Sequence, residues 1–296
     1  MSVAGLALHP FSTPKTLDEA LALLAERSAR AEKTVLLAGG TDWFVERHVA
    51  PAEEAGVLPL VVDVSRLDAL RGIAVEGETL HIGAAATYLE IRKDARVAAR
   101  CPLLAATARD VGALQIQARG TLGGNLASGS PAADGVAALA ALDATLLLRS
   151  IRGARRVPLA GFYTGYRRSV LAADELIEAI EIALPPEGSP FAWRKVGTRQ
   201  AQAISKVAFA GLAVVASGRL ARLGLGMASV APTVALLPAT RALGLSKPLG
   251  EVTDADVEQA VLADVSPIDD VRSTAAYRRH VAVRLAQRFF GELRAL

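Results

Sequence analysis

The chain of 296 residues contains a single cysteine, Cys101. One thiol excludes an internal disulfide, and it excludes an iron–sulfur cluster held by this chain alone, because such a cluster needs four ligands that are usually cysteines. The low cysteine content favours a cytoplasmic location. We interpret Cys101, which precedes Pro102, as a small apolar residue of the core.

Histidines and the common catalytic motifs are equally scarce. The four histidines, His9, His48, His81 and His280, are far apart and have no ligand-like spacing, so no metal site is predicted. The sequence contains neither a Gly-x-Ser-x-Gly elbow nor a Walker loop. No Gly-x-Gly-x-x-Gly pattern follows the first expected strand, and a Rossmann dinucleotide fold is therefore not predicted.

The chain also lacks long apolar runs and a strong net charge, and it has few aromatic residues. The runs "VAFAGLAVVAS" and "DATLLL" are shorter than the roughly 18 residues that span a membrane. The first residues lack the features of an export signal. Aromatic residues make up 4% of the chain and the net charge is +3, which argues against a nucleic-acid partner.

Hydrophobic periodicity predicts a mixed α+β protein. We expect a helix over residues 16–29, a hairpin over 73–87, and two helices that are interrupted near Pro102. The strand that ends at Pro185 is followed by "PPEGSP", and this Pro/Gly break is the predicted domain boundary.

Two glycine-rich stretches remain, "LLAGGTD" at 36–42 and "RGTLGGNLASGSPAADG" at 119–135. Glycine removes the Cβ that would hold a ligand away from the backbone, and successive free amides form a concave site for an anion. The two stretches together favour a long, phosphate-containing cofactor. The alternative is that each is only a turn. Polar side chains that could assist are Thr41, Thr121, Asn125 and Asp134, the last as an acceptor from sugar hydroxyls.

Four segments in order carry a family resemblance: "LLAGGTDWF", "QIQARGTLGGNLASGSPAADGVAALAALDATLLLRS", "RRVPLAGFYTGYRRSVLAADELIEAIEIALP" and "WRKVGTRQAQAISKVAFA". They resemble the FAD-binding subunit of the molybdenum hydroxylases, the family of xanthine dehydrogenase and carbon monoxide dehydrogenase. "GSPAADG" and "SPIDDVRSTAAYRR" are more similar to bacterial xanthine dehydrogenase subunits.

The resemblance implies a two-subdomain FAD-binding fold of the PCMH type over residues 1–56 and 57–184. A C-terminal α+β domain with a small antiparallel sheet, residues 185–296, is expected to follow and to close over the flavin. The FAD-binding residues that the resemblance implies are Leu37, Ala38, Gly39, Gly40, Thr41, Asp42, Trp43, Ile116, Thr121, Gly123, Gly124, Asn125, Asp134, Ile177 and Lys195.

The implied function is electron transfer. Electrons from iron–sulfur centres on a partner subunit would pass through FAD on this chain to a terminal acceptor, for which NAD, a quinone and oxygen are candidates. The iron–sulfur centres and the molybdenum cofactor are expected on other polypeptides. No catalytic side chain is expected, because the flavin carries the chemistry.

Two other functions are open at this point. One is a stand-alone flavoprotein oxidoreductase of the same fold with its own substrate pocket, and the other is an assembly or binding protein without the cofactor.

The C-terminal helix has an apolar face formed by Tyr277, Val281, Leu285, Phe289 and Leu293. We expect Arg278, Arg279, Arg284 and Arg288 on a solvated basic side, or alternatively an anchor for other subunits. Arg199 and Lys206 are interpreted as surface residues.

Overall fold

The computed structural model describes residues 9–49 and 58–296. The expected boundary between residues 56 and 57 therefore lies outside the described residues. The N-terminal part contains a parallel sheet in the order β1-β3-β2, formed by β1 (Phe11–Ser12), β3 (Leu60–Asp63) and β2 (Thr34–Leu37). Helix α1 (Leu17–Ala29) confirms the predicted helix, and the Thr16 hydroxyl caps it by accepting from the Glu19 amide at 3.1 Å.

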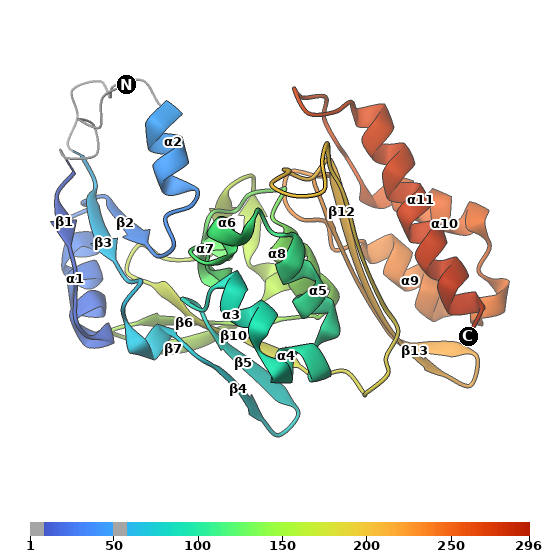
Figure 1. Ribbon diagram of the computed structural model, residues 1–296, viewed down its shortest axis with the longest axis horizontal. Helices are drawn as coiled ribbons and strands as arrows, with labels where there is room; N and C mark the ends of the chain where they lie inside the picture. Colours follow the sequence, from blue (N-terminus) through green and yellow to red (C-terminus); the bar gives the residue numbers. More distant parts are fainter. Residues whose placement is uncertain (1–8, 50–57) are drawn as a thin grey trace.

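The central part is a five-stranded antiparallel sheet in the order β4-β5-β10-β6-β7. Its strands are β4 (Ile73–Glu76), β5 (Thr79–Gly83), β6 (Thr145–Ser150), β7 (Gly153–Pro158) and β10 (Leu176–Ala183). Strand β6 alternates buried and half-buried residues, as expected for a sheet with one covered face. Figure 1 shows the helices α3 to α8 stacked above this sheet.

The helices of the central part are α3 (Tyr88–Lys93), α4 (Ala95–Arg100), α5 (Pro102–Asp110), α6 (Leu114–Gln117), α7 (Leu122–Ala127) and α8 (Asp134–Ala141). The sequence predicted one interruption, near Pro102, but the chain also breaks at Asp94. This residue ends α3, and its carboxylate accepts from the amides of Arg96 and Val97 at the start of α4. Local side-chain capping therefore competed successfully with continuation of the helix.

The C-terminal part confirms the predicted α+β domain with a small antiparallel sheet. Its strands are β11 (Phe191–Val196), β12 (Val207–Ala216) and β13 (Arg219–Ala228), and its helices are α9 (Pro238–Ser246), α10 (Asp254–Asp264) and α11 (Ala275–Arg294). In Figure 1 this sheet stands between α8 on one side and α9 to α11 on the other.

Small residues allow α8 to lie directly on the C-terminal sheet. A Cβ at Gly224 would lie 1.8 Å from the Ala141 carbonyl oxygen, and one at Gly226 would lie 2.0 Å from that of Ala137. The two faces of the sheet belong to different cores, because Ala208 belongs to the cluster around α8 whereas Phe209 belongs to the cluster that contains Phe289. The central and C-terminal parts thus share a packed interface.

The basic side expected on α11 is only partly right. Arg278 is buried, with 4% of its surface exposed, and it donates to the Ser229 carbonyl and pairs with Asp270 at 2.6 Å. Tyr277, expected on the packed face, is 42% exposed. Among the described residues, no helix has the length and apolarity that a membrane crossing requires.

Candidate binding site

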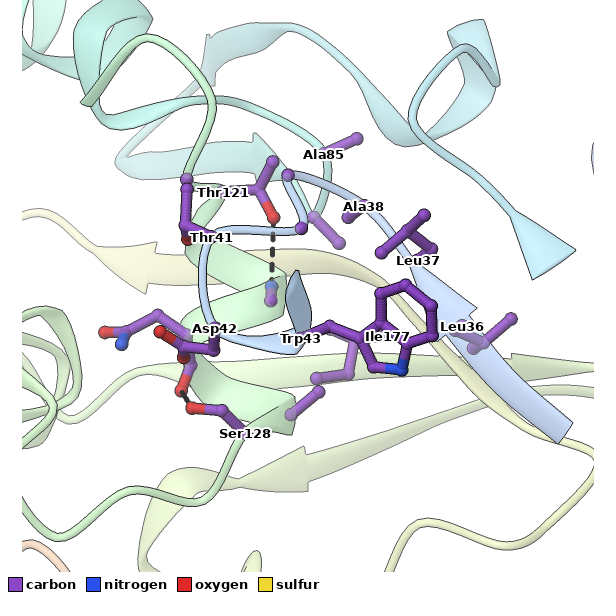
Figure 2. A pocket seen from close by; sticks show the side chains of 18 of the residues that line it. Leu36, Leu37, Ala38, Thr41, Asp42, Trp43, Ala85, Thr121, Ser128 and Ile177 are labelled. Carbon is purple, nitrogen blue, oxygen red and sulfur yellow. Dashed lines mark hydrogen bonds between the residues drawn. The ribbon is translucent and has the colours of Figure 1, made fainter. Parts of the chain in front are cut away.

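A cavity of about 310 Å³ opens beside two turns of the glycine-rich stretches, residues 38–42, called the first bend, and residues 119–125, called the second bend. Figure 2 shows the first bend and the side chains of Trp43 and Ile177, which both line this cavity. Helix α2 (Trp43–Val49) begins at the end of the first bend, and α7 begins within the second. All lining residues lie between positions 36 and 177, so in the described structure the C-terminal domain does not close over this cavity.

The first bend offers unpaired backbone donors. Among the described residues, none of the backbone amides from Gly39 to Asp42 donates a hydrogen bond to a protein group. Gly40 has a φ of +74°, a left-handed conformation that favours glycine and turns successive amides toward the same side. Free amides on a concave turn attract an anion, and a diphosphate is the group that best matches several of them at once.

The second bend is also rich in glycine, but most of it forms the N-terminal turn of α7. The amide of Leu122 donates to the Ala86 carbonyl at 3.0 Å, and that of Gly123 donates to the Ala84 carbonyl at 2.9 Å. The Gly124 amide donates to the Thr121 hydroxyl at 3.1 Å, the dashed line beside Thr121 in Figure 2. Most donors of this bend are therefore already used inside the protein.

The two bends touch each other at Gly39. A Cβ there would lie 2.0 Å from the Arg119 carbonyl oxygen and 3.0 Å from the Gly120 Cα. The hydroxyl of Thr41 also lies close, 3.4 Å from the Cβ position of Gly120. Two segments about eighty residues apart in sequence thus form one continuous backbone surface, which requires glycine at the contact.

The cavity has an apolar wall next to these polar bends. It is formed by Leu36, Val64, Leu70, Leu176 and Ile177. The last two lie on strand β10. Its pairing with β6 shifts register at Glu178, whose backbone carbonyl accepts from the Ala84 amide at 2.9 Å. A site with backbone donors at one end and aliphatic side chains along its wall fits a nucleotide that carries a large aromatic ring.

Three charged side chains line the cavity: Asp42, Glu46 and Arg167. Arg167 pairs with Glu46 at 2.8 Å and is the only basic residue among the described lining residues. Loss of water around the carboxyl, followed by the charge of Glu46, raises the pKa of Asp42 above its ordinary value. In the described part of the chain, no group of three or more His, Cys, Asp or Glu side chains could hold a metal ion.

Most residues predicted for the site line this cavity. They are Leu37, Ala38, Gly39, Gly40, Thr41, Asp42, Trp43, Ile116, Thr121, Gly123, Gly124, Asn125 and Ile177. The structure brings these residues together, whereas Asp134 and Lys195 are not among the lining residues. Contact with a bound cofactor stays a prediction for each of them.

Asp134 and Lys195 instead bind each other behind the second bend. The Lys195 ammonium lies 2.5 Å from one Asp134 oxygen and also donates to the Asp110 carbonyl at 2.7 Å. The Ser205 hydroxyl donates to the other Asp134 oxygen at 2.5 Å. Burial raises the pKa of the Asp134 carboxyl, and Lys195 and Ser205 oppose this shift. The pair joins the start of α8 to β11, so it ties the central part to the C-terminal domain.

Sequence reasoning missed several lining residues, among them Glu46, Tyr88, Ser128 and Arg167. Arg167 lies at the tip of the hairpin formed by β8 (Tyr163–Gly165) and β9 (Arg168–Ser169), with a φ of +52°. Nothing in the local pattern places that tip beside the first bend. A buried tyrosine at the start of α3, four residues after Ala84, offered no signal either.

Family models match almost the whole chain. Residues 6–185 match the model described as the FAD binding domain in molybdopterin dehydrogenase, and residues 192–293 match the CO dehydrogenase flavoprotein C-terminal domain.

Individual proteins are similar over comparable lengths. The nicotinate dehydrogenase FAD-subunit of Eubacterium barkeri is 38% identical over 203 residues, 67% of this chain and 66% of that subunit. The xanthine dehydrogenase FAD-binding subunit of Escherichia coli O157:H7 is 30% identical over 94% of this chain and 93% of that subunit. The carbon monoxide dehydrogenase medium chain of Hydrogenophaga pseudoflava is also 30% identical, over 94% of both chains.

The fold is likewise similar to a solved structure. A chain of carbon monoxide dehydrogenase from Hydrogenophaga pseudoflava superimposes with a TM-score of 0.85 at 28% identity, covering 95% of both chains. Sequence identity does not separate the xanthine type from the carbon monoxide type, since both relatives stand at 30%.

Proposed function

The chain belongs to the family of FAD-binding medium subunits of the molybdopterin dehydrogenases, and we propose that it transfers electrons from iron–sulfur centres on a partner subunit through FAD to a terminal acceptor. It is an oxidoreductase subunit with an FAD-binding domain. The relatives are named as subunits or medium chains, which supports a complex with an iron–sulfur subunit and a molybdenum-cofactor subunit.

The observation that carries the proposal is the row of amides from Gly39 to Asp42, which donate to no protein group among the described residues and lie beside an apolar wall. The amides would hold the diphosphate, and the wall that includes Ile177 would contact the flavin ring. FAD supplies a centre that accepts electrons singly and releases them in pairs. The residues of this chain bind and orient the cofactor, and Arg167 adds a positive charge at the rim.

The substrate of the complex would be determined on another subunit. Relatives named for nicotinate, xanthine and carbon monoxide dehydrogenases are similar to this chain over 67% to 94% of its length. A subunit that is shared among such different chemistries does not need to recognise the substrate. NAD is our candidate for the terminal acceptor, with a quinone and oxygen as the alternatives.

Co-purification tests this function. The full chain is purified alone and together with the subunits that accompany it, and both preparations are analysed for flavin, iron and molybdenum. We expect FAD in both preparations, and iron and molybdenum only in the complex. A colourless chain that does not bind added FAD would contradict the proposal.

A second measurement separates this function from a stand-alone flavoprotein. An organic substrate should reduce the flavin in the complex but not in the isolated chain. Substrate turnover by the isolated chain would instead support an independent oxidoreductase of the same fold.

A further inference from the structure

Tyr88 and Asn125 form a hydrogen-bonded pair in the wall of the cavity. Tyr88 is the first residue of α3 and is 1% exposed, and Asn125 lies in α7. The Tyr88 hydroxyl donates to Oδ1 of Asn125 at 2.7 Å. Both residues line the cavity. The glycine residues of the two bends do not explain why a phenol is buried here or why it is paired with Asn125.

The surroundings of the pair favour one orientation of the Asn125 amide. A Cβ at Gly135, in the first turn of α8, would lie 2.0 Å from the Tyr88 hydroxyl and 2.9 Å from Oδ1 of Asn125. Both oxygens therefore lie beside the N-terminal turn of α8, which carries partial positive charge and favours a carbonyl oxygen over an amino group. Burial raises the pKa of Tyr88 well above its ordinary value, so the phenol keeps its proton and is able to donate to this oxygen.

The amino group of Asn125 consequently has a different task. In the described part of the chain, Nδ2 of Asn125 donates to no protein group. Asn125 is half-buried and lines the cavity, so this NH₂ group is available to a ligand.

We propose that Tyr88 is a positioning residue, which holds Asn125 so that its NH₂ group donates to an acceptor oxygen of the bound flavin nucleotide. The inference rests on the proposed function, because it takes FAD as the occupant of this cavity. Gly135 is part of the same arrangement, since any side chain there would occupy the position of the phenol.

A double-mutant cycle tests whether Tyr88 acts through Asn125. FAD affinity of the full-length apoprotein is measured by flavin fluorescence for Tyr88→Phe, Asn125→Ala and the double variant. We expect Asn125→Ala to weaken binding about tenfold, as for loss of a hydrogen bond to a charged group. Tyr88→Phe should weaken it about fivefold, and the double variant should match Asn125→Ala. Multiplied effects in the double variant would overturn the proposal.

Tyr163→Phe is the matched control. Tyr163 also donates a phenolic hydrogen bond to α7, but to the Leu126 carbonyl at 2.8 Å, and it does not line this cavity. This variant should lower the melting temperature while FAD affinity stays within about twofold. A drop in affinity equal to that of Tyr88→Phe would point to a general structural effect instead.

Asn125→Asp gives an answer even if Tyr88→Phe does not fold. The carboxylate keeps an acceptor for Tyr88 but places a second oxygen where the NH₂ group stood, so FAD affinity should fall more than in Asn125→Ala. If the amide were reversed, with Oδ1 toward the ligand, Asn125→Asp would keep that acceptor, affinity would fall less than in Asn125→Ala, and our assignment would be wrong. A wild-type chain that binds no FAD would contradict the proposed function itself, whereas FAD binding with an unaffected Asn125→Asp variant contradicts the donor role of Asn125 and with it the positioning role of Tyr88.

Discussion

The two glycine-rich bends share their composition but differ in what their backbone donors do. From Gly39 to Asp42 the amides make no protein hydrogen bonds among the described residues, whereas those of Leu122, Gly123 and Gly124 are all used. Glycine in the first bend leaves donors available to a ligand. Gly123 in the second allows α7 to lie against Ala84.

Because of this difference, the two bends are not expected to play equal roles in the site. We expected both bends to bind the cofactor through their amides. We therefore propose a division in which the first bend binds an anion through its amides and the second forms a wall of the cavity, with the pair of Asp134 and Lys195 linking the end of the second glycine-rich stretch to β11.

The largest effect is expected for Lys195→Met. Removing one partner of a buried ion pair leaves an unpaired charge, which typically costs about 3–5 kcal/mol. We expect the free energy of unfolding to fall by about that amount, as measured by urea denaturation of the apoprotein. Lys33→Met, at an exposed position, is the control. Unchanged stability together with weaker FAD binding would instead place Lys195 against the cofactor.

Gly39→Ala tests the contact between the bends. The new Cβ would overlap the Arg119 carbonyl, and because both neighbours are backbone the strain cannot be relieved by a side-chain rotation. We expect a loss of about 3 kcal/mol in the free energy of unfolding. Gly161→Ala, where a Cβ meets nothing within 4 Å, should be nearly neutral. Equal stability of the two variants would mean that the bends do not touch.

Gly124→Val separates binding from folding. In the protein, a Cβ at this position meets only the Thr121 hydroxyl, at 2.8 Å, so the added side chain would extend into the cavity region. FAD affinity should fall about a hundredfold. The free energy of unfolding should fall by only about 1 kcal/mol, through the disturbed helix cap. Retention of stoichiometric flavin would exclude our placement of the cofactor.

These expectations show what sequence could and could not predict. The positions of both bends follow from local glycine patterns. Of the 15 residues that the family resemblance implied, 13 line the cavity, which has 27 lining residues among those described. The use of the amides was not predictable, because it depends on Ala84 and Ala86, more than thirty residues before the second bend. Asp134 was assigned to a sugar because its partner Lys195 lies 61 residues away. Arg167 was missed since only the tertiary fold brings its hairpin tip to the first bend.

Arg167→Gln tests the charge at the rim. Removing the only basic residue among the described lining residues should weaken FAD binding about tenfold, because the diphosphate loses a nearby positive charge. The neighbouring, exposed Arg168 gives the matched control Arg168→Gln. The difference between the two variants should shrink at high salt, where exposed charges are screened. Equal affinities at low salt would show that Arg167 remains paired with Glu46.

The smallest effect concerns the carboxyl of Asp42 in the first bend. Its pKa is raised in the folded protein, so the folded state binds the proton more tightly than the unfolded chain does. The stability of the apoprotein should therefore rise as pH falls through this raised pKa toward the ordinary value. Protonation also removes a negative charge beside the proposed diphosphate, so FAD affinity should rise about threefold over the same interval. Asp42→Asn should reduce both dependences, as measured by urea denaturation and by flavin-fluorescence titrations at a series of pH values; the raised pKa of Asp134 would leave part of the stability dependence in place. If the wild-type affinity instead falls on acidification, Asp42 acts as an ionised acceptor from the cofactor, and the first bend does more than offer its amides.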